Sequence, residues 1–535
     1  MTVTDLAPYR SGQTPGRDGF AQLLRSEWTK LRTVRGWIIG LVLAVLLTVL
    51  LGVLTAVGGS ISCSDSPTGP TLSGAACRQI PPLGPDGEPV TDSFYLVHRT
   101  LTGNGSITVR VTGLSGRYSP NGAVQVGGVD DGMVPGIQPW SKAGIIIKDG
   151  TGQGSTYAAM TTTGGNGVRM QYDYTHDLAG MPGQPTASSP QWLRLTRSGD
   201  TVTGYDSADG THWTEVGSAT LPGLPAGAQA GLFAASPDHT VAGSGFGTSS
   251  AVGGPSLATG SLDELATQGS WAGSWTGTAI GGGGPLGGNG TNAERFAASG
   301  GLYTVTGSGD IAPATGQQTG QPVERGLAGA FAGLIALIVV AALFVTAEYR
   351  RGLIRVTLAA SPRRGRVLAA KAVVAGAAGF VLGLVAAVVT LPLADHLSYA
   401  HGAYLLPASV TTQARVVVGT AALFAVVAVF ALGVGTLLRR SAATVTVVIV
   451  LIVLPYILAT ASVLPGGAAQ WLARLTPAAA FAVQQTIVPF HQVTGNYTPG
   501  GGYFPLGPWT GLGVLCLYAA LAFALAARRL RRGDA

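Results

Sequence analysis

The sequence predicts a polytopic α-helical membrane protein with six transmembrane helices and a large extracytoplasmic all-β domain, a jelly-roll sandwich, inserted between helices 1 and 2. Only 11% of the 535 residues are charged, whereas an ordinary soluble domain carries about a quarter. Six apolar runs are long enough to cross a hydrocarbon layer roughly 30 Å thick. The chain also contains 81 glycines. That number is too high for a plain helical bundle, and most of these glycines lie between the first two apolar runs.

The apolar runs define the expected spans. They cover approximately 37–57, 327–347, 372–391, 416–437, 442–463 and 509–527. A cleavable signal peptide is the alternative for the first run, but 36 residues precede it and no A-x-A site follows closely. The fourth and fifth runs are separated only by Leu438-Arg439-Arg440-Ser441, which predicts a tight turn at one membrane face. Glycine pairs at 329/333 and 379/383 indicate close helix packing, within the subunit or across a dimer.

The positions of Lys and Arg predict the orientation, because short cytoplasmic loops are enriched in both. With both termini inside, the inner segments hold 19 of the 32 Lys and Arg residues and five acids, so they carry +14 and the rest −7. These inner segments are 1–36, 348–371, 438–441 and 528–535. We therefore expect a multi-pass plasma-membrane protein with cytoplasmic termini and residues 58–326 extracellular. The overall charge of +7 then reflects topology and contact with membrane lipid, and a nucleic-acid-binding role loses its support.

The cytoplasmic N-terminus, 1–36, is expected to contain an interfacial amphipathic helix. In GFAQLLRSEWTKLRTVR (19–35), apolar residues recur at helical spacing and bases fill the other faces. The apolar positions are Phe20, Leu23, Leu24, Trp28, Leu31 and Val34, and the bases are Arg25, Lys30, Arg32 and Arg35. This pattern suits a helix lying in the inner membrane interface. A simple orientation signal is the alternative, and the two interpretations are compatible.

The extracytoplasmic region, 58–326, is expected to hold a β-sandwich at about 92–250, then a Gly-rich linker and further strands over 251–326. Short β-like runs recur between 94 and 218, beginning with FYLVHRTL (94–101) and SITVRVT (106–112), and are separated by Gly, Asp and Asn. Many such strands with no helical stretch between them indicate the jelly-roll class. Pro/Gly/Ser-rich stretches at 58–91 and 247–290 are expected to be linkers.

One of these runs, VRMQYDY (168–174), shows the period of two most clearly. Val168, Met170, Tyr172 and Tyr174 fall on one face, and the residues between them are polar. This alternation predicts a half-buried antiparallel strand.

The chain has three cysteines. Cys63 and Cys77 lie in the exported linker, and Cys516 lies in the last span. We expect a disulfide between Cys63 and Cys77, because an exposed thiol pair outside a cell tends to oxidise; two unpaired thiols are the alternative. No Cys or His cluster has zinc spacing, so we expect no metal site.

The main inner loop, AEYRRGLIRVTLAASPRRGRVLAAK (347–371), mixes seven bases with an apolar set. A loop that is only solvated would not need these apolar residues, so we expect a surface helix that docks on a cytosolic partner. A helix lying on anionic lipid is the alternative. None of the four lysines lies in G-x-x-x-x-G-K-[ST], so the chain lacks a phosphate-binding loop. We expect no enzyme activity and no cofactor in this chain, with ATP bound by a partner subunit.

The order of these elements resembles a type-2 ABC exporter permease of the actinobacterial kind. The matching strings are LLRSEWTKLRTVRGW (23–37), the inner loop above and WLARLTPAAAFAVQQT (471–486). The resemblance covers 1–57 and 327–535 and implies that the inner loop is the coupling helix contacting the ATPase. It places coupling at Glu348, Tyr349, Arg350, Arg351, Gly352, Arg355, Pro362, Arg363 and Arg364. The first outer loop of such permeases is usually short, and here it holds a whole domain.

The extracellular domain resembles concanavalin-like and laminin-G-like sandwich modules. The strings that carry this resemblance are PWSKAGIIIKD (139–149), QWLRLTRSGDTVTGYDSADGTHWTEVG (191–217) and AGLFAAS (230–236). In lectin-like relatives, exposed aromatics and acids hold sugar, which makes Trp140, Tyr172, Asp173 and Asp177 the candidates here. Packing of these aromatics in the core is the stronger alternative.

The sequence therefore favours a permease subunit of an ATP-binding-cassette transporter, exporting a hydrophobic or amphipathic substrate. Its expected partners are a cytoplasmic ATPase, a second permease subunit and membrane lipid. A membrane-anchored surface protein that binds glycans through the lectin-like domain is the alternative.

Overall fold

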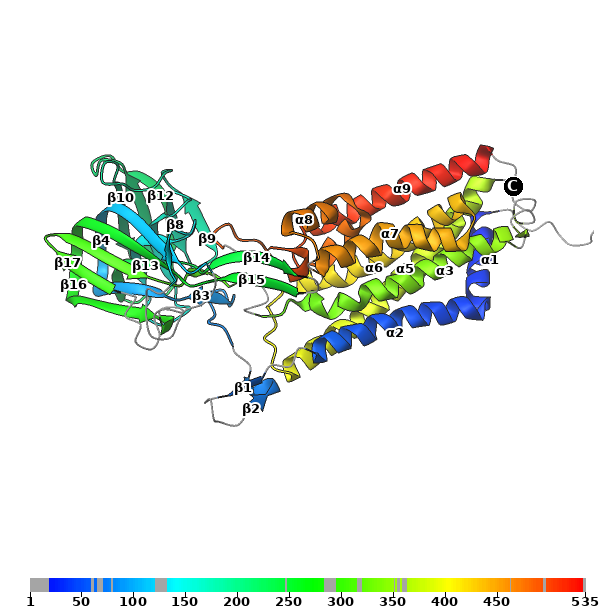
Figure 1. Ribbon diagram of the computed structural model, residues 1–535, viewed down its shortest axis with the longest axis horizontal. Helices are drawn as coiled ribbons and strands as arrows, with labels where there is room; N and C mark the ends of the chain where they lie inside the picture. The colour runs from blue at the N-terminus through cyan, green and yellow to red at the C-terminus, as the bar shows by residue number, and fades with distance from the viewer. Residues whose placement is uncertain are drawn as a thin grey trace, which may run out of the picture.

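The computed structural model is elongated, with a helical bundle at one end and a β-sheet domain at the other (Figure 1). It describes residues 19–58, 62–64, 71–77, 80–120, 132–245, 248–282, 295–314, 320–350, 352–353, 357, 363–461, 463–493 and 497–532. Within these residues, six helices are long and apolar enough to cross a membrane, and the β-sheet domain is inserted after the first of them. The predicted fold class is confirmed.

The six candidate spans follow the apolar runs closely. They are α2 (Arg35–Val57), η3 with α3 (Val323–Gly329 and Ala330–Arg350), α5 (Arg364–Ala400), α6 (Val410–Leu438), α7 (Ser441–Thr460) and α9 (Pro508–Arg532). Helix α5 begins eight residues before the apolar run it contains, because Lys371 and neighbouring bases continue the helix beyond its apolar part. The expected tight turn is present, since α6 ends at Leu438 and α7 starts at Ser441.

Close helix packing depends on small residues. A Cβ atom on Gly333 would lie 2.7 Å from the carbonyl oxygen of Ala44, and one on Gly379 would lie 2.8 Å from that of Phe424. Glycine at these positions lets α3 approach α2 and α5 approach α6 without a clash. The predicted close packing is therefore found within the subunit. Helix α6 is the most covered span and α2 the least, with 67% and 17% of their apolar windows buried.

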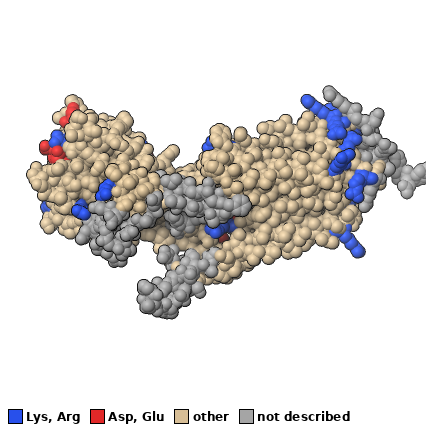
Figure 2. All heavy atoms as spheres, in the orientation of Figure 1, with Lys and Arg blue, Asp and Glu red and all other residues tan. Residues whose placement is uncertain are grey.

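The end of the bundle away from the sheet carries helix α1 (Phe20–Thr33) and most of the positive charge. Helix α1 runs across this end, roughly perpendicular to α2, and the C-terminus lies there too (Figure 1). Lys and Arg gather on this end, as Figure 2 shows. We call it the basic end, and we call the opposite end, next to the β-sheet domain, the sheet end.

Three short elements lie between α7 and α9, the last of which is the 3-10 helix η5 (Pro499–Gly501). Helix α8 (Gly466–Leu475) is amphipathic, and the 3-10 helix η4 (Pro477–Gln484) is buried at every position. Residues 485–493 continue from η4 toward the β-sheet domain.

The main sheet of the β-domain is entirely antiparallel. Its strands run in the order β12-β11-β10-β4-β13-β6-β7-β8-β9, and β16 also pairs with β4. The strands of this path and β16 are β4 (Phe94–Tyr118), β6 (Lys142–Lys148), β7 (Tyr157–Thr163), β8 (Val168–Tyr172), β9 (His176–Ala179), β10 (Gln191–Ser198), β11 (Thr201–Ser207), β12 (Thr214–Thr220), β13 (Gly227–Ala235) and β16 (Ser256–Ile280).

Smaller strands complete the domain. Strand β5 (Val134–Pro135) pairs with β4, β18 (Leu302–Gly307) pairs with β16, and β17 (Arg295–Ser299) pairs with β18. Three two-stranded ladders stand apart from the main sheet. They are β1 (Ser62–Ser64) with β2 (Thr71–Ser73), β3 (Val90–Asp92) with β19 (Ile311–Pro313), and β14 (His239–Gly245) with β15 (Thr248–Gly254).

The main sheet has an apolar core on each of its faces. On β6, Ile145 and Ile147 point into the larger core, and Ile146 points into a second core on the opposite face. Strand β6 is buried along its whole length for this reason. The second core lies beneath the β3–β19 ladder, whose Val90 and Ile311 contribute to it.

Three expectations for this region differ from the structure. The two runs expected within 94–112 form one strand, β4, because β10, β13 and β16 pair along its length. The stretch 247–290, expected to be a linker, contains the 25-residue strand β16. Tyr174 does not share the face of Val168 and Met170. It lies beyond the end of β8 with a φ of 59° and packs in the second core.

Candidate functional site

Four charged side chains meet at the basic end, and we call them the charge cluster. Lys371 Nζ on α5 lies 2.7 Å from Glu27 Oε2 on α1 and 2.7 Å from Glu348 Oε1 on α3. Lys30 Nζ, also on α1, lies 2.7 Å from Glu27 Oε1 and 2.9 Å from Glu348 Oε1. Two acids and two bases therefore join three helices in a neutral set.

The ion pairs that Lys371 makes with Glu27 and Glu348 are the most deeply buried in the charge cluster. The side chains of Glu27 and Lys371 are 2% exposed, whereas that of Lys30 is 35% exposed. Burial alone would lower the pKa of Lys30, but its hydrogen bonds to Glu27 and Glu348 outweigh burial and raise this pKa. A charge this deeply buried is tolerated only when it is paired. The positions of α1, α3 and α5 at the basic end are therefore tied to one another.

Sequence reasoning assigned only one member of the charge cluster, Glu348, to the coupling set. Its carboxylate accepts hydrogen bonds from Lys30 and Lys371, and its side chain is 9% exposed. Direct contact of Glu348 with an ATPase remains a prediction. The signals for the missed members were present: Glu27 is the single acid on α1, and Lys371 is one of four lysines in the chain.

The other coupling candidates that the structure describes lie at the end of α3 and the start of α5. Tyr349 is partly buried, with the guanidinium of Arg439 5.2 Å from its ring centre, and Arg350 and Arg363 are exposed. Gly352 has a φ of 68°, which favours glycine. Arg364 donates a hydrogen bond of 2.6 Å to the carbonyl of Leu530, near the end of α9. Arg351, Arg355 and Pro362 lie outside the described residues.

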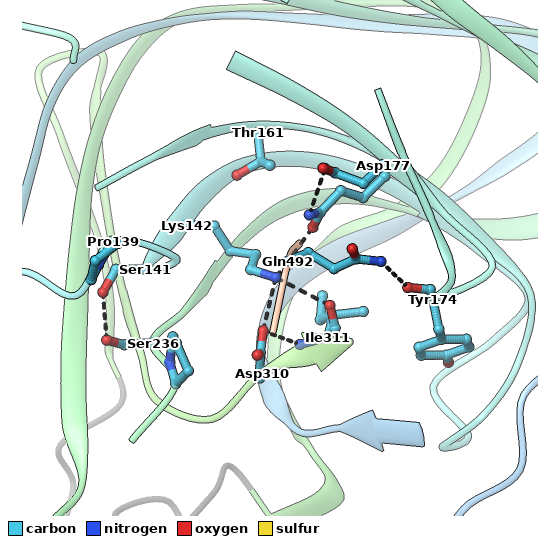
Figure 3. A network of polar contacts seen from close by, with 12 residues as sticks. Pro139, Ser141, Lys142, Thr161, Tyr174, Asp177, Ser236, Asp310, Ile311 and Gln492 are labelled. Carbon is cyan, nitrogen blue, oxygen red and sulfur yellow. Dashed lines mark hydrogen bonds and ion pairs between the residues drawn. The ribbon is translucent and has the colours of Figure 1, made fainter. Parts of the chain in front are cut away.

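A second polar network lies on the face of the sheet covered by the β3–β19 ladder (Figure 3). Lys148 and Asp92 are fully buried and lie 2.7 Å apart. Tyr174 donates a hydrogen bond of 2.7 Å from its hydroxyl to the same Asp92 oxygen. Burial lowers the pKa of Lys148 and raises that of Tyr174. Lys142, also buried, pairs with Asp310 at 2.8 Å.

Gln492, from the segment after η4, reaches into this network from the helical bundle. Its side chain donates a hydrogen bond of 3.0 Å to the carbonyl of Tyr174, and the residue is only 3% exposed (Figure 3). The accepting carbonyl lies in a turn where Asp173 and Tyr174 have positive φ angles of 43° and 59°. Non-glycine residues adopt such angles rarely and at a cost. The turn thus presents a backbone acceptor to the bundle.

We expect Gln492→Ala to weaken this attachment. Loss of the buried carboxamide removes the hydrogen bond to Tyr174, so the amides of 173–176 should exchange hydrogen faster, by roughly five-fold for a bond worth about 1 kcal/mol. Hydrogen exchange on the full chain measures this. Gln413→Ala is the matched control, because Gln413 also donates from its carboxamide to a backbone carbonyl but is exposed. Unchanged exchange at 173–176 in the Gln492 variant would contradict the attachment.

The candidate sugar-binding residues all make contacts within the protein. Trp140 is 8% exposed, with the guanidinium of Arg169 5.7 Å from its ring centre. Tyr172 stacks on His176, Asp173 accepts hydrogen bonds from Thr156 and Tyr157, and Asp177 pairs with Arg169. Burial raises the pKa of Asp173. Arg169 thus contacts both Trp140 and Asp177, whereas Tyr172 and Asp173 make other contacts, and sugar binding remains a prediction.

Two further expectations concern metals and cysteines. Within the described ranges, no group of three or more His, Cys, Asp or Glu side chains is arranged to hold a metal ion. Cys516 is a free cysteine in α9. The side chain of Cys63 lies outside the described residues, so its pairing with Cys77 remains a prediction.

Comparisons with known proteins give one match over most of the chain. A family model described as "ABC-2 family transporter protein" matches residues 159–535, which includes much of the β-sheet domain and all helices from α3 onward. A search of curated proteins finds no significant match.

Solved structures show only distant likenesses. SCP-B, a member of the Eqolisin family of peptidases, is 10% identical, with a TM-score of 0.23 and coverage of 40% of this chain and 98% of that chain. A functionally unknown protein from Saccharomyces cerevisiae is 14% identical, with a TM-score of 0.20 and coverage of 37% and 85%. The GH43 protein BlXynB from Bacillus licheniformis, as a mutant, is 15% identical, with a TM-score of 0.16 and coverage of 24% of each chain. At these TM-scores the likenesses carry no argument.

Proposed function

The chain belongs to the ABC-2 transporter family, and from this premise we propose that it is the membrane subunit of an exporter driven by a separate cytoplasmic ATPase. ABC-2 permeases work with ATPase subunits, and this chain has no phosphate-binding loop of its own. The observation that carries the proposal is the charge cluster, because it ties α1, α3 and α5 together beside the basic loop after α3.

The charge cluster supports a specific way in which movement of a docked ATPase is transmitted to α1, α3 and α5. An ATPase docked on 348–366 would push on the end of α3 and the start of α5. Because Lys371 and Glu348 are joined to Glu27 through buried ion pairs, α1 would move with them as one unit. Closure of two ATPases, on two permease subunits, would then shift the spans between arrangements that bind substrate differently.

The orientation proposed from the sequence fits the position of the basic end. Lys and Arg gather where α1 and the C-terminus lie, and cytoplasmic membrane faces favour such residues (Figure 2). We assign the basic end to the cytoplasm and the β-sheet domain to the outside of the plasma membrane. The substrate is proposed to be hydrophobic or amphipathic because the spans are apolar. ATPase stimulation of the reconstituted complex by a compound panel would identify it.

Replacement of Arg350, Arg351 and Arg355 by Glu tests the coupling assignment. These substitutions reverse the charge of the proposed docking loop, and we expect recovery of the ATPase in a pull-down to fall at least ten-fold, about the effect of losing one strong charge contact. Each permease variant is the bait, and the cytoplasmic ATPase of the proposed transporter is the protein recovered.

A matched control separates the loss of docking from the effect of a changed net charge at the basic end. Arg440, Arg528 and Arg531 are exposed bases on the same basic end but outside the loop. Their replacement by Glu makes the same change of net charge, and we expect ATPase recovery close to that of the unmodified protein. Equal recovery from both triple variants would overturn the coupling assignment.

A further inference from the structure

A groove of about 550 Å³ opens between α2 and α3 at the basic end, on the side of the bundle. We infer that it holds one acyl chain of an anionic phospholipid, whose phosphate group lies against Arg32 and Arg35. This inference concerns lipid binding by the permease itself and does not depend on the ATPase.

The groove opens beside the contact between the two helices, which continues at the basic end through the rings of Trp37 and Phe344, 5.2 Å apart. Near the sheet end, glycine lets the two helices touch: a Cβ atom on Gly329 would lie 2.5 Å from the carbonyl oxygen of Thr48. One on Gly40, closer to the basic end, would meet the side chain of Val340 at 2.5 Å. At Gly36, one turn further, nothing lies within 4 Å of such an atom. The space beside this contact is therefore a wedge, closed at one end and open at the other.

The walls of the groove suit a hydrocarbon chain. They are formed by apolar side chains of both helices, including Trp37, Leu43, Leu47, Ile335, Val339 and Leu343. The volume falls within the range of about 300–1,000 Å³ that is usual for small-molecule sites. Helix α2 is the least buried span, so the groove opens sideways toward the lipid around the protein.

The open end of the wedge is positively charged, and no acid among the described residues pairs with its two arginines. Arg32 ends α1 and Arg35 begins α2, next to the groove-lining Val34 and Gly36, and both are exposed. In the described part of the chain, neither forms an ion pair. The nearby carboxylates, Glu27 and Glu348, are already paired with Lys30 and Lys371.

The N-terminus of α2 adds to the attraction of this site for an anion. Its N-cap residue, Val34, offers no side-chain acceptor to the first backbone N–H groups of the helix. Unpaired N–H groups at a helix N-terminus attract phosphate. An acyl chain in the wedge would carry its headgroup to this position, so the apolar walls and the basic rim fit the two parts of one lipid.

Photolabelling tests the site. The full chain is placed in nanodiscs of equal parts phosphatidylglycerol and phosphatidylcholine, with a photoactivatable acyl chain on either lipid, and labelled peptides are mapped. We expect phosphatidylglycerol to label the peptides of α2 and α3 in preference to phosphatidylcholine. Arg32→Gln with Arg35→Gln should reduce this labelling roughly 30-fold, about five-fold for each lost charge near the membrane surface.

Two more variants make the result specific. Gly36→Leu should abolish labelling by filling the wedge, because a Cβ atom there has no neighbour within 4 Å and the larger side chain enters open space. Arg25→Gln should leave labelling close to wild type, because Arg25 lies on α1 about 10 Å along the helix from Arg32. Equal labelling by the two lipids, or unchanged labelling of the arginine double variant, would overturn the inference. So would cross-links between two copies of α2, which would show that a second subunit covers the groove.

Discussion

Replacement of Lys371 by Met is expected to lower the free energy of unfolding of the helical bundle by about 3–5 kcal/mol, the usual cost of removing one partner from a buried ion pair. Lys371 is the buried base of the charge cluster, at 2.7 Å from both Glu27 and Glu348. Without it, two carboxylates would share the partly exposed Lys30 and repel each other in a dry environment. The midpoint of thermal unfolding of the purified protein in detergent measures the loss.

A charge-matched double variant separates the loss of charge balance from the loss of packing. Lys371→Met with Glu27→Gln leaves one acid and one base, Glu348 and Lys30, so it should recover a large part of the lost stability. Lys30→Met should cost much less than Lys371→Met, because water already screens the exposed Lys30. Equal melting of wild type and Lys371→Met would show that the charge cluster does not hold α1, α3 and α5 together.

Replacement of Lys148 by Met is expected to destabilise the β-sheet domain by a similar amount, about 3–5 kcal/mol. Lys148 donates hydrogen bonds to Asp92, the carbonyl of Ser155 and the hydroxyl of Tyr174. Its removal leaves the carboxylate of Asp92 completely buried without a cation. Because Asp92 lies on β3, the β3–β19 ladder should detach first, and calorimetry of the full chain should show an earlier transition for the β-sheet domain.

A less buried ion pair in the same domain provides the control. Arg110 on β4 pairs with Asp263 on β16 at 2.7 Å, and their side chains are 32% and 22% exposed. Arg110→Met should therefore shift the transition far less than Lys148→Met. Equal shifts from the two variants would mean that burial does not set the strength of the Lys148–Asp92 pair.

Apolar length and charge along the chain were enough to predict the spans and the amphipathic helix α1. These features are local, because a helix that crosses a membrane needs a continuous apolar run and α1 needs only a period of 3.6 residues. Strand β8 was found in the same way, through its alternation. Tyr174 was misplaced because a turn with positive φ at Asp173 and Tyr174 interrupts that alternation, and no glycine stands at either position to indicate it.

The sites were harder to predict because their members are distant in sequence. Glu27 and Lys371 are separated by 344 positions, and Tyr174 and Gln492 by 318. Composition could indicate that buried charges need partners, but not which residues would pair. Strand β16 was missed for a related reason: its glycines and serines resemble a linker, and its strand conformation comes from pairing with β4, more than a hundred residues earlier.

The chain leaves and re-enters the bundle at neighbouring points. A Cβ atom on Gly52, near the end of α2, would lie 2.3 Å from the carbonyl oxygen of Gly326 in η3. Packing between α2 and η3 thus already brings together the two points at which the β-sheet domain joins the bundle. The entropy of loop closure grows slowly, by about 0.6 kcal/mol for each doubling of length. The bundle therefore accommodates an insert between α2 and η3 at a closure cost that changes little with the length of the insert.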